Sequence, residues 1–184
     1  MPAMPAQKPV TLFFCYAPED EELRRKLDDH LALLVRGGVV ESWSGGAVGA
    51  GAEWRSALDR QMERADVILL LVSAAFLASD HLYDVELRRA LGRREAGRSE
   101  VLGVLLRPCD WNHEELASVR MLPERINAAG AREVVPVTSL PNLDDAFARV
   151  VTELRTLLEK ERAPAPRRIS RNPPLAHSLP APRG

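Results

Sequence analysis

The feature that most constrains the fold is the run VILLLV at positions 67–72, in which every side chain is apolar. A strand with one solvated face alternates apolar and polar residues, whereas a parallel strand covered by helices on both faces is apolar throughout. A second such run, VLGVLL, occupies positions 101–106. Even when it is extended to VILLLVSAAFL, the first run is shorter than the roughly 20 apolar residues that span a bilayer. The chain is therefore predicted to contain a buried parallel sheet.

Apolar runs alternate with segments of helical periodicity throughout positions 10–161. Three further strands are predicted at VTLFFCY (10–16), VVESW (39–43) and VVPV (134–137), and the predicted helices cover 19–36, a stretch after residue 52, 80–91 and a stretch from residue 143. This βαβαβαβαβα order is typical of an α/β domain. We predict a flavodoxin-like five-stranded parallel sheet in the order 2-1-3-4-5, with helices on both faces.

The two ends of the chain differ from the domain predicted at 10–161. Residues 1–9 contain no apolar signal core, so we expect the protein to stay in the cytosol. Residues 162–184 are rich in proline and arginine and contain no acid, which is typical of a disordered linker or tail. A basic tail that touches nucleic acid or lipid is the less favoured alternative. The formal net charge of −1 predicts no general attraction to nucleic acid or to a membrane.

Cysteine and histidine are too sparse to indicate a metal centre. The two cysteines and four histidines include no pair at ligand spacing, so no metal site is expected. Cys15 and Cys109 lie at the ends of the first and fourth predicted strands, which the third strand separates. Two strand spacings place them roughly 9.6 Å apart, beyond the roughly 7 Å limit for a disulfide. Both are predicted to be free thiols with a packing role.

The predicted topology places a candidate site at the carboxyl ends of the first and third strands. The crevice of such a sheet opens where successive connections leave in opposite directions. The helix after the third strand is predicted to begin near Asp80, and Glu86 lies within its first two turns. Two interpretations of Glu86 are open at this point. It is either a carboxylate of the crevice or an exposed charge that pairs with Arg89 at i+3.

Other chemistries are not supported by the residues at the strand ends. The glycine-rich loop SGGAVGAGA at 44–52 contains neither GxGxxG nor a GK[ST] ending, so it is not predicted to bind phosphate. No GxSxG elbow or histidine base accompanies Ser73, so a serine nucleophile is not predicted. A phosphoacceptor domain would need an aspartate where Ser73 stands and a lysine near Val137, and the chain has neither.

Several separated motifs resemble a bacterial TIR (Toll/interleukin-1 receptor) domain. They are VTLFFCYAPED, VVESW with its loop, GAEW, ADVILLLVSAAFLASDHLYDVELRRAL, VLGVLLRPCDW and LP, in the family's order from about position 10 to 158. The resemblance implies the five-stranded parallel sheet already predicted. It also implies cleavage of NAD+ between nicotinamide and ribose, with the essential glutamate at Glu86. NAD+ is then the substrate, and no cofactor is implied.

The resemblance implies a substrate pocket around Glu86. The implied binding residues are Tyr16, Ala17, Pro18 and Glu19 after the first strand, and Trp43 and Ser44 at the second strand. Trp54, Ser73 and Tyr83 are predicted as further substrate-binding residues. Trp43 and Trp54 fit core packing equally well, and Asp20 is interpreted as a helix N-terminal charge. One carboxylate suffices because nicotinamide leaves as a neutral molecule and needs no general acid. Glu86 would stabilise the oxocarbenium-like transition state.

The function implied is that of an NAD+ glycohydrolase giving ADP-ribose or a cyclic ADP-ribose, acting as an effector in bacterial immune signalling. The resemblance also implies self-association through the loop at 44–52. The proline-rich tail suggests a join to a sensor or regulatory domain, as in a longer parent protein. The alternative is a non-catalytic scaffold for TIR–TIR interaction. Glu86 favours the enzyme. Two features are compatible with the scaffold. One is the glycine-rich loop, and the other is Leu82, which stands where many active members carry an aromatic residue.

Overall fold

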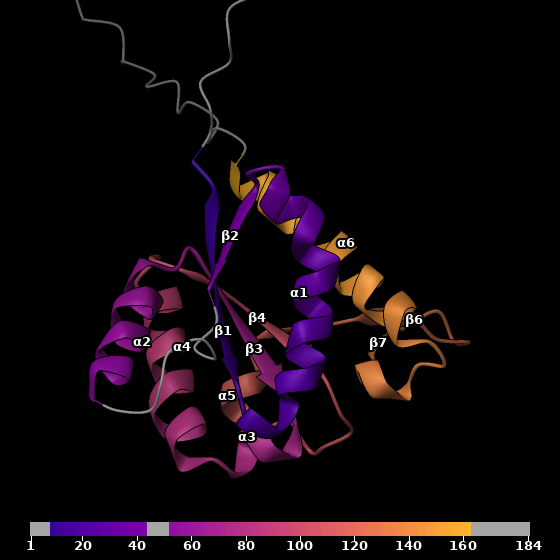
Figure 1. Ribbon diagram of the computed structural model, residues 1–184. Helices are drawn as coiled ribbons and strands as arrows, with labels where there is room; N and C mark the ends of the chain where they lie inside the picture. Colours follow the sequence, from indigo (N-terminus) through magenta and orange to yellow (C-terminus); the bar gives the residue numbers. More distant parts are fainter. Residues whose placement is uncertain (1–7, 44–51, 163–184) are drawn as a thin grey trace, which may run out of the picture.

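The computed structural model describes residues 8–43 and 52–162, which contain a central parallel sheet (Figure 1). Its five strands have the order β2-β1-β3-β4-β5, as predicted. The strands are β1 (Val10–Tyr16), β2 (Val40–Trp43), β3 (Val67–Val72), β4 (Glu100–Leu105) and β5 (Arg120–Leu122). The tails predicted at 1–9 and 162–184 and the loop at 44–52 lie almost entirely outside the described residues.

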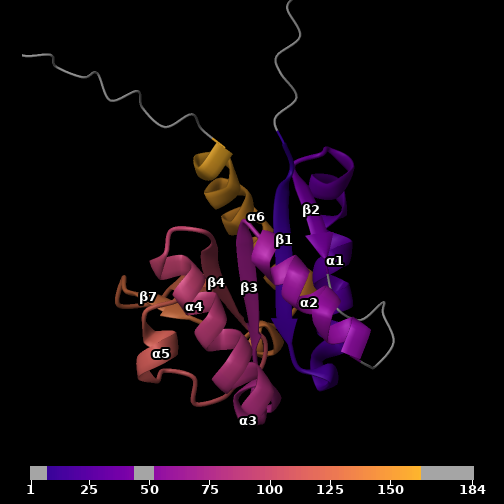
Figure 2. The same ribbon diagram turned by 90° about the vertical axis from the view of Figure 1, so that its left-hand side faces the viewer.

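Helices cover both faces of the sheet (Figures 1 and 2). The helices α1 (Glu21–Arg36) and α6 (Leu143–Arg162) lie on one face, and α2 (Ala52–Arg64) and α4 (Arg88–Glu95) lie on the other. Along β1, Phe14 packs in the core beneath α1 and α6, whereas Phe13 and Cys15 pack beneath α2 and α4. All residues of β3 are buried. The uninterrupted apolar run thus reflects a strand covered on both sides.

The segment after β3 contains three helical pieces of different winding. The short helix α3 (Ala74–Ala78) is followed by η3 (His81–Leu87), a π-helix that continues directly into α4. A π-helix forms hydrogen bonds between residues i and i+5 and is frequent at functional sites. The predicted helix start near Asp80 is confirmed, but the seven residues of η3 are wound more widely than an α-helix.

The fifth strand of the sheet is not the one that the sequence indicated. VVPV at 134–137 was predicted, but the edge strand is β5, which pairs with β4. Two further strands, β6 (Glu124–Ile126) and β7 (Arg132–Val134), form a separate antiparallel ribbon, and Val137 begins the 3-10 helix η4 (Val137–Ser139). The prediction was wrong because β5 has only three residues and carries no recognisable apolar pattern, whereas VVPV does.

Gly103 explains how the short strand β5 fits against β4. It pairs in register with Met121, and a Cβ at position 103 would lie 2.0 Å from Met121 Sδ. Real Cβ atoms do not approach other atoms so closely. The bare backbone at Gly103 therefore makes room for the buried Met121 side chain, which joins the core beneath α4.

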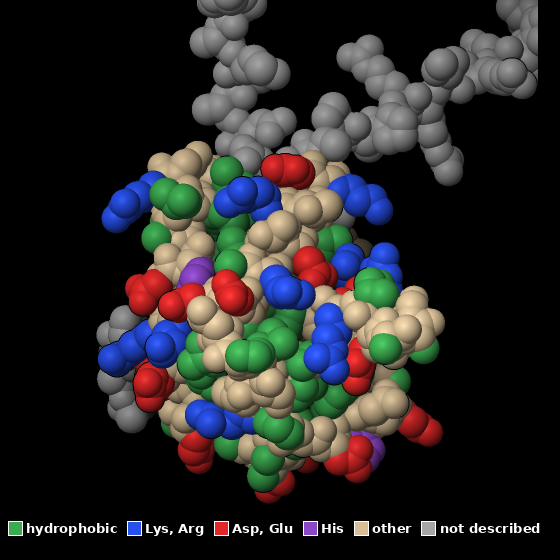
Figure 3. Space-filling view, turned by 90° about the vertical axis from the view of Figure 1, so that its right-hand side faces the viewer, with side chains coloured by type: hydrophobic (Ala, Val, Ile, Leu, Met, Phe, Trp, Pro, Cys, Tyr) green, Lys and Arg blue, Asp and Glu red, His purple; other side chains and the backbone are tan. Residues whose placement is uncertain are grey.

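Within the described residues, no helix is both long and apolar enough to cross a bilayer. Figure 3 shows basic and acidic side chains interspersed on the side of the molecule that carries α6. This mixture on one face agrees with the small net charge of the chain.

Candidate functional site

Glu86 lies near the end of η3, with its side chain only 13% exposed. The thiol of Cys15, on the neighbouring strand β1, donates a hydrogen bond to its carboxylate. On the other side, His81 Nε2 lies 3.3 Å from Glu86 Oε1, and the His81 side chain is 54% exposed. The carboxylate is therefore held between a buried thiol and an imidazole that solvent can reach.

The surroundings of Glu86 oppose its charge. Burial raises the pKa of Glu86, while the Cys15 hydrogen bond and the proximity of His81 act in the opposite direction. Burial, followed by the charge of Glu86, raises the pKa of the Cys15 thiol well above its ordinary value. The thiol thus stays protonated and able to donate. A poorly solvated carboxylate with a raised pKa is typical of a functional site.

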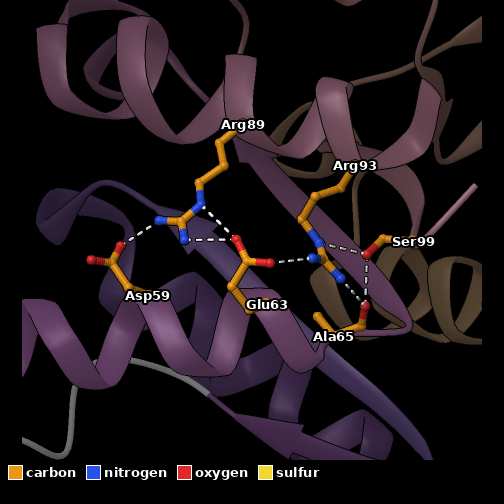
Figure 4. A network of polar contacts seen from close by, with 6 residues as sticks. All are labelled: Asp59, Glu63, Ala65, Arg89, Arg93 and Ser99. Carbon is orange, nitrogen blue, oxygen red and sulfur yellow. Dashed lines mark hydrogen bonds and ion pairs between the residues drawn. The ribbon is translucent and has the colours of Figure 1, made fainter. Parts of the chain in front are cut away.

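Arg89 is occupied by other carboxylates and does not pair with Glu86. Its guanidinium binds Asp59 and, at 2.7 Å, Glu63 Oε1, both on α2 (Figure 4). Arg93, one turn further along α4, binds Glu63 Oε2 at 2.7 Å. The interpretation of Glu86 as a surface charge paired with Arg89 is therefore wrong. The two arginines instead fasten α4 to α2.

Two cavities meet at Glu86. The larger, of about 480 Å³, lies at the carboxyl end of β1, and the smaller, of about 260 Å³, lies between α2 and η3. Glu86, His81 and Leu58 line both. The larger cavity is also lined by Phe14, Tyr16, Pro18, Glu21, Arg25, Ser79 and Leu82, and the smaller by Phe13, Arg55, Asp59, Met62, Val85 and Arg89. Small-molecule sites have volumes of roughly 300–1,000 Å³, so the pair is large enough for a ligand.

Tyr16 is the tyrosine that lines the larger cavity, beside Phe14, and its contacts hold it in place. The Arg24 guanidinium carbon lies 5.5 Å from the centre of its ring. Burial and a hydrogen bond to Glu21 raise the pKa of Tyr16 to about 12. The hydrogen bond from Arg24 is the main cause that lowers the pKa of Glu21 to about 2. The phenol is therefore a neutral group against an ionised carboxylate.

The structure brings only some of the predicted binding residues to these cavities. Tyr16 and Pro18 line the larger one with Glu86. Ala17 is buried in the core beneath, and Glu19 is exposed. Tyr83 forms a hydrogen bond with Glu115, in the short helix α5 (Glu114–Ala117). The side chains of Trp43 and Trp54, and all of Ser44 and the loop from 44 to 51, lie outside the described residues.

Ser73 is fully buried and is engaged by structural partners. Its hydroxyl donates to Asp20 and accepts from the Phe76 amide at 3.2 Å, which caps α3. Asp20, in the 3-10 helix η1 (Pro18–Asp20), was interpreted as a helix N-terminal charge. It is buried and also accepts from Arg107 Nε at 2.9 Å. Ser73 and Asp20 therefore tie together the segments that follow β1, β3 and β4.

The contact between His81 and Glu86 is the part of the site that the sequence did not indicate. In an α-helix, residues five apart point about 140° away from each other around the axis. The π-helix places them on the same side. The two cysteines are free, as predicted, but Cys15 does more than pack, because its thiol binds Glu86. Among the described residues, no group of His, Cys, Asp and Glu side chains could hold a metal ion.

Comparison with known proteins relates the chain to one family. The sequence model of the family described as "TIR domain" matches residues 12–139. The "Uncharacterized protein y4lF" of Sinorhizobium fredii is 39% identical over 145 residues, which is 79% of this chain and 42% of that protein. The crystal structure of the TIR domain of the Toll-related receptor TRR-2 from Hydra magnipapillata is similar at 19% identity and a TM-score of 0.46, covering 60% of this chain and 82% of that one. The chain thus spans less than half the length of its curated relative.

Proposed function

Because the chain belongs to the TIR domain family, we propose that it is an NAD+ glycohydrolase of the cytosol with Glu86 as its catalytic carboxylate. The observation that carries the proposal is the placement of Glu86. It is poorly solvated, it lines two adjoining cavities, and it binds an imidazole and a thiol, while the nearby Arg89 guanidinium binds Asp59 and Glu63. Its charge is therefore available to a bound molecule.

The proposed reaction breaks the bond between the ribose carbon and the nicotinamide nitrogen. The electron pair of that bond goes to the nitrogen, so nicotinamide leaves neutral and no general acid is needed. The ribose then carries oxocarbenium character, and the negative charge of Glu86 stabilises it. This interaction is stronger where little water screens it. Water adds to the ribose carbon and loses a proton to give ADP-ribose, whereas attack by an adenine nitrogen gives a cyclic product.

The larger cavity suits a planar part of the substrate. Tyr16 supplies an aromatic surface there, and Pro18 and the buried Leu82 supply apolar walls. Because Arg24 already lies over the Tyr16 ring, a bound ring would use the remaining surface of Tyr16. Binding roles for Trp43 and Ser44 rest on the family resemblance alone, and a binding role for Trp54 rests on the sequence alone.

The test is nicotinamide release from NAD+ by the purified protein and by Glu86→Gln. Glutamine keeps the shape and the acceptor oxygen but removes the charge. We expect the substitution to lower the rate by about 100-fold or more, as loss of a transition-state electrostatic contact does. Glu153→Gln is the matched control, because Glu153 is a partly buried glutamate on α6 that binds Arg120, far from Glu86 in the sequence. Equal release by wild type and Glu86→Gln would reject the proposal.

A second candidate is a non-catalytic scaffold for TIR–TIR interaction. Leu82 supports it, because many active relatives carry an aromatic residue at this position of the larger cavity. Absence of nicotinamide release from a protein that sedimentation shows to be assembled would favour the scaffold. For either function we propose a sensor or regulatory partner and a role in bacterial immune signalling. The greater length of the curated relative is consistent with such a partner.

A further inference from the structure

We propose that His81 is a positioning residue that holds the Glu86 carboxylate in its charged form, facing the two cavities. The inference rests on the proposed function and adds a side chain that the family resemblance does not assign. It stands on the geometry of η3, on the burial of Glu86 and on the shared walls of the two cavities.

The π-helical winding of η3 creates the pair. His81 and Glu86 are five residues apart, and His81 Nε2 lies 3.3 Å from Glu86 Oε1. An α-helix would separate the two side chains by about 140° around its axis. In η3 both side chains instead line both cavities. The unusual winding thus has a specific consequence for the candidate site.

Glu86 needs such a partner because burial favours the neutral form of a carboxyl group. A neutral carboxylic acid could not stabilise a cationic transition state. Cys15 donates from the buried side but carries no charge while its thiol is protonated. His81 approaches from the exposed side and can both donate a hydrogen bond and carry a positive charge.

Apart from Arg55, which lines the smaller cavity, the other charged groups near His81 bind other partners or oppose the charge of Glu86. Charged and titratable groups reach the two cavities from β1 (Tyr16, with Cys15 at Glu86), α1 (Glu21, Arg25), α2 (Arg55, Asp59) and α4 (Arg89). Arg25 binds Glu21, and Arg89 binds Asp59 and Glu63. The charge of Asp59 raises the pKa of Glu86, whereas His81 lowers it through both its charge and its hydrogen bond. Loss of His81 should therefore leave Glu86 protonated up to a higher pH.

The direct test follows the titration of the Glu86 carboxyl group by NMR, which needs no turnover. In His81→Leu, we expect the midpoint to move to higher pH than in wild type. His81→Gln keeps a donor nitrogen near the position of Nε2 but cannot be charged, so its midpoint should lie between the two. The matched control is His113→Leu, because His113 is 56% exposed and lies 3.8 Å from the carboxylate of Asp110. His113→Leu should leave the Glu86 midpoint unchanged.

An unchanged or lowered midpoint in His81→Leu would overturn the proposal. If His81→Leu does not fold, His81→Gln decides alone, because its midpoint must still lie above that of wild type. The assay of nicotinamide release adds a second readout. We expect the acid limb of the kcat/KM profile to move to higher pH in His81→Leu, with a loss of about tenfold on that limb. A loss that is independent of pH would contradict a positioning role.

Failure of the proposed function can be distinguished from failure of this inference. If assembled wild type releases no nicotinamide but the Glu86 midpoint moves as expected, the enzyme proposal fails and the role of His81 in holding the charge stands. If wild type is active and the midpoint does not move, the enzyme proposal stands and the role of His81 is rejected.

Discussion

At the scale of single residues, the site depends on a charge that the fold does not favour. Burial favours the neutral form of Glu86, which shares the smaller cavity with Phe13, Leu58 and Met62, and the thiol of Cys15 and the imidazole of His81 assist its ionisation. A surface glutamate would be more stable but would act through water, which weakens electrostatic effects. Stability lost at a functional group in exchange for activity is a general feature of active sites.

This conflict predicts that Glu86→Gln stabilises the fold at neutral pH. Because burial raises the folded-state pKa of Glu86, the folded protein keeps a proton that the unfolded chain has already lost. The stability from this proton is complete below the unfolded pKa and is lost as the pH rises through the folded pKa. At pH 7, glutamine should therefore raise the free energy of unfolding by about 1 kcal/mol, or Tm by roughly 3 °C. The gain should disappear below about pH 4.

Thermal unfolding followed by circular dichroism between pH 4 and 8 measures this effect. Glu153→Gln again serves as the control, because no such gain is expected from a glutamate that binds Arg120 at the surface. A Tm that falls in Glu86→Gln at pH 7 would show that the ionised carboxylate stabilises the fold, contrary to the prediction.

At the scale of elements, the position of α2 decides the shape of the smaller cavity. α2 supplies Leu58 and Asp59 to its wall, and the arginines of α4 hold α2 in place through Glu63 (Figure 4). Arg93 is the inner of the two, with a side chain only 8% exposed against 32% for Arg89. It also donates to Ser99 Oγ at 2.9 Å and to the Ala65 carbonyl oxygen at 3.4 Å.

The difference in burial predicts unequal effects of the two arginines on stability. Arg93→Ala should lower the free energy of unfolding by about 2 kcal/mol, because it removes buried hydrogen bonds and the packing of the side chain. Arg89→Ala should lower the free energy of unfolding by less than about 1 kcal/mol, since ion pairs near the surface contribute little to stability. Urea unfolding measures the free energy of unfolding of the two variants. Each variant replaces an arginine of α4 that binds Glu63, so the two differ mainly in the burial of the side chain. An equal or larger loss in Arg89→Ala would contradict this assignment.

At the scale of the whole molecule, the arrangement of strands and helices was predictable from sequence where an apolar pattern extends over many residues. The all-apolar β3 required a covered sheet, and the alternation of strands and helices predicted the strand order and the helix that carries Glu86. Short or locally unusual features were not predictable. β5 has too few residues to show a period, and nothing in HLYDVEL distinguishes a π-helix from an α-helix. His81 was missed for that reason, and the burial of Ser73 depends on Asp20, 53 residues away in the sequence.

Assembly is the remaining property of the whole molecule, and the resemblance implies that a neighbouring copy completes the site through the loop at 44–52. If so, activity per molecule should depend on protein concentration. Below the dissociation constant of the assembly, a tenfold dilution should lower nicotinamide release per molecule by up to about tenfold, by mass action. An enzyme whose site is complete within one chain would instead show release strictly proportional to concentration.

Mixing wild type with Glu86→Gln separates assembly from catalysis. A Glu86→Gln chain has no catalytic charge, but it still presents the surface that a neighbour needs. Added in excess to dilute wild type, it should raise nicotinamide release severalfold, because more wild-type chains then have a neighbour. An equal amount of an unrelated protein of similar size controls for non-specific effects and should change nothing. Release that is unaffected by the added variant would show that each chain works alone, and the role of the loop at 44–52 in completing the site would be rejected.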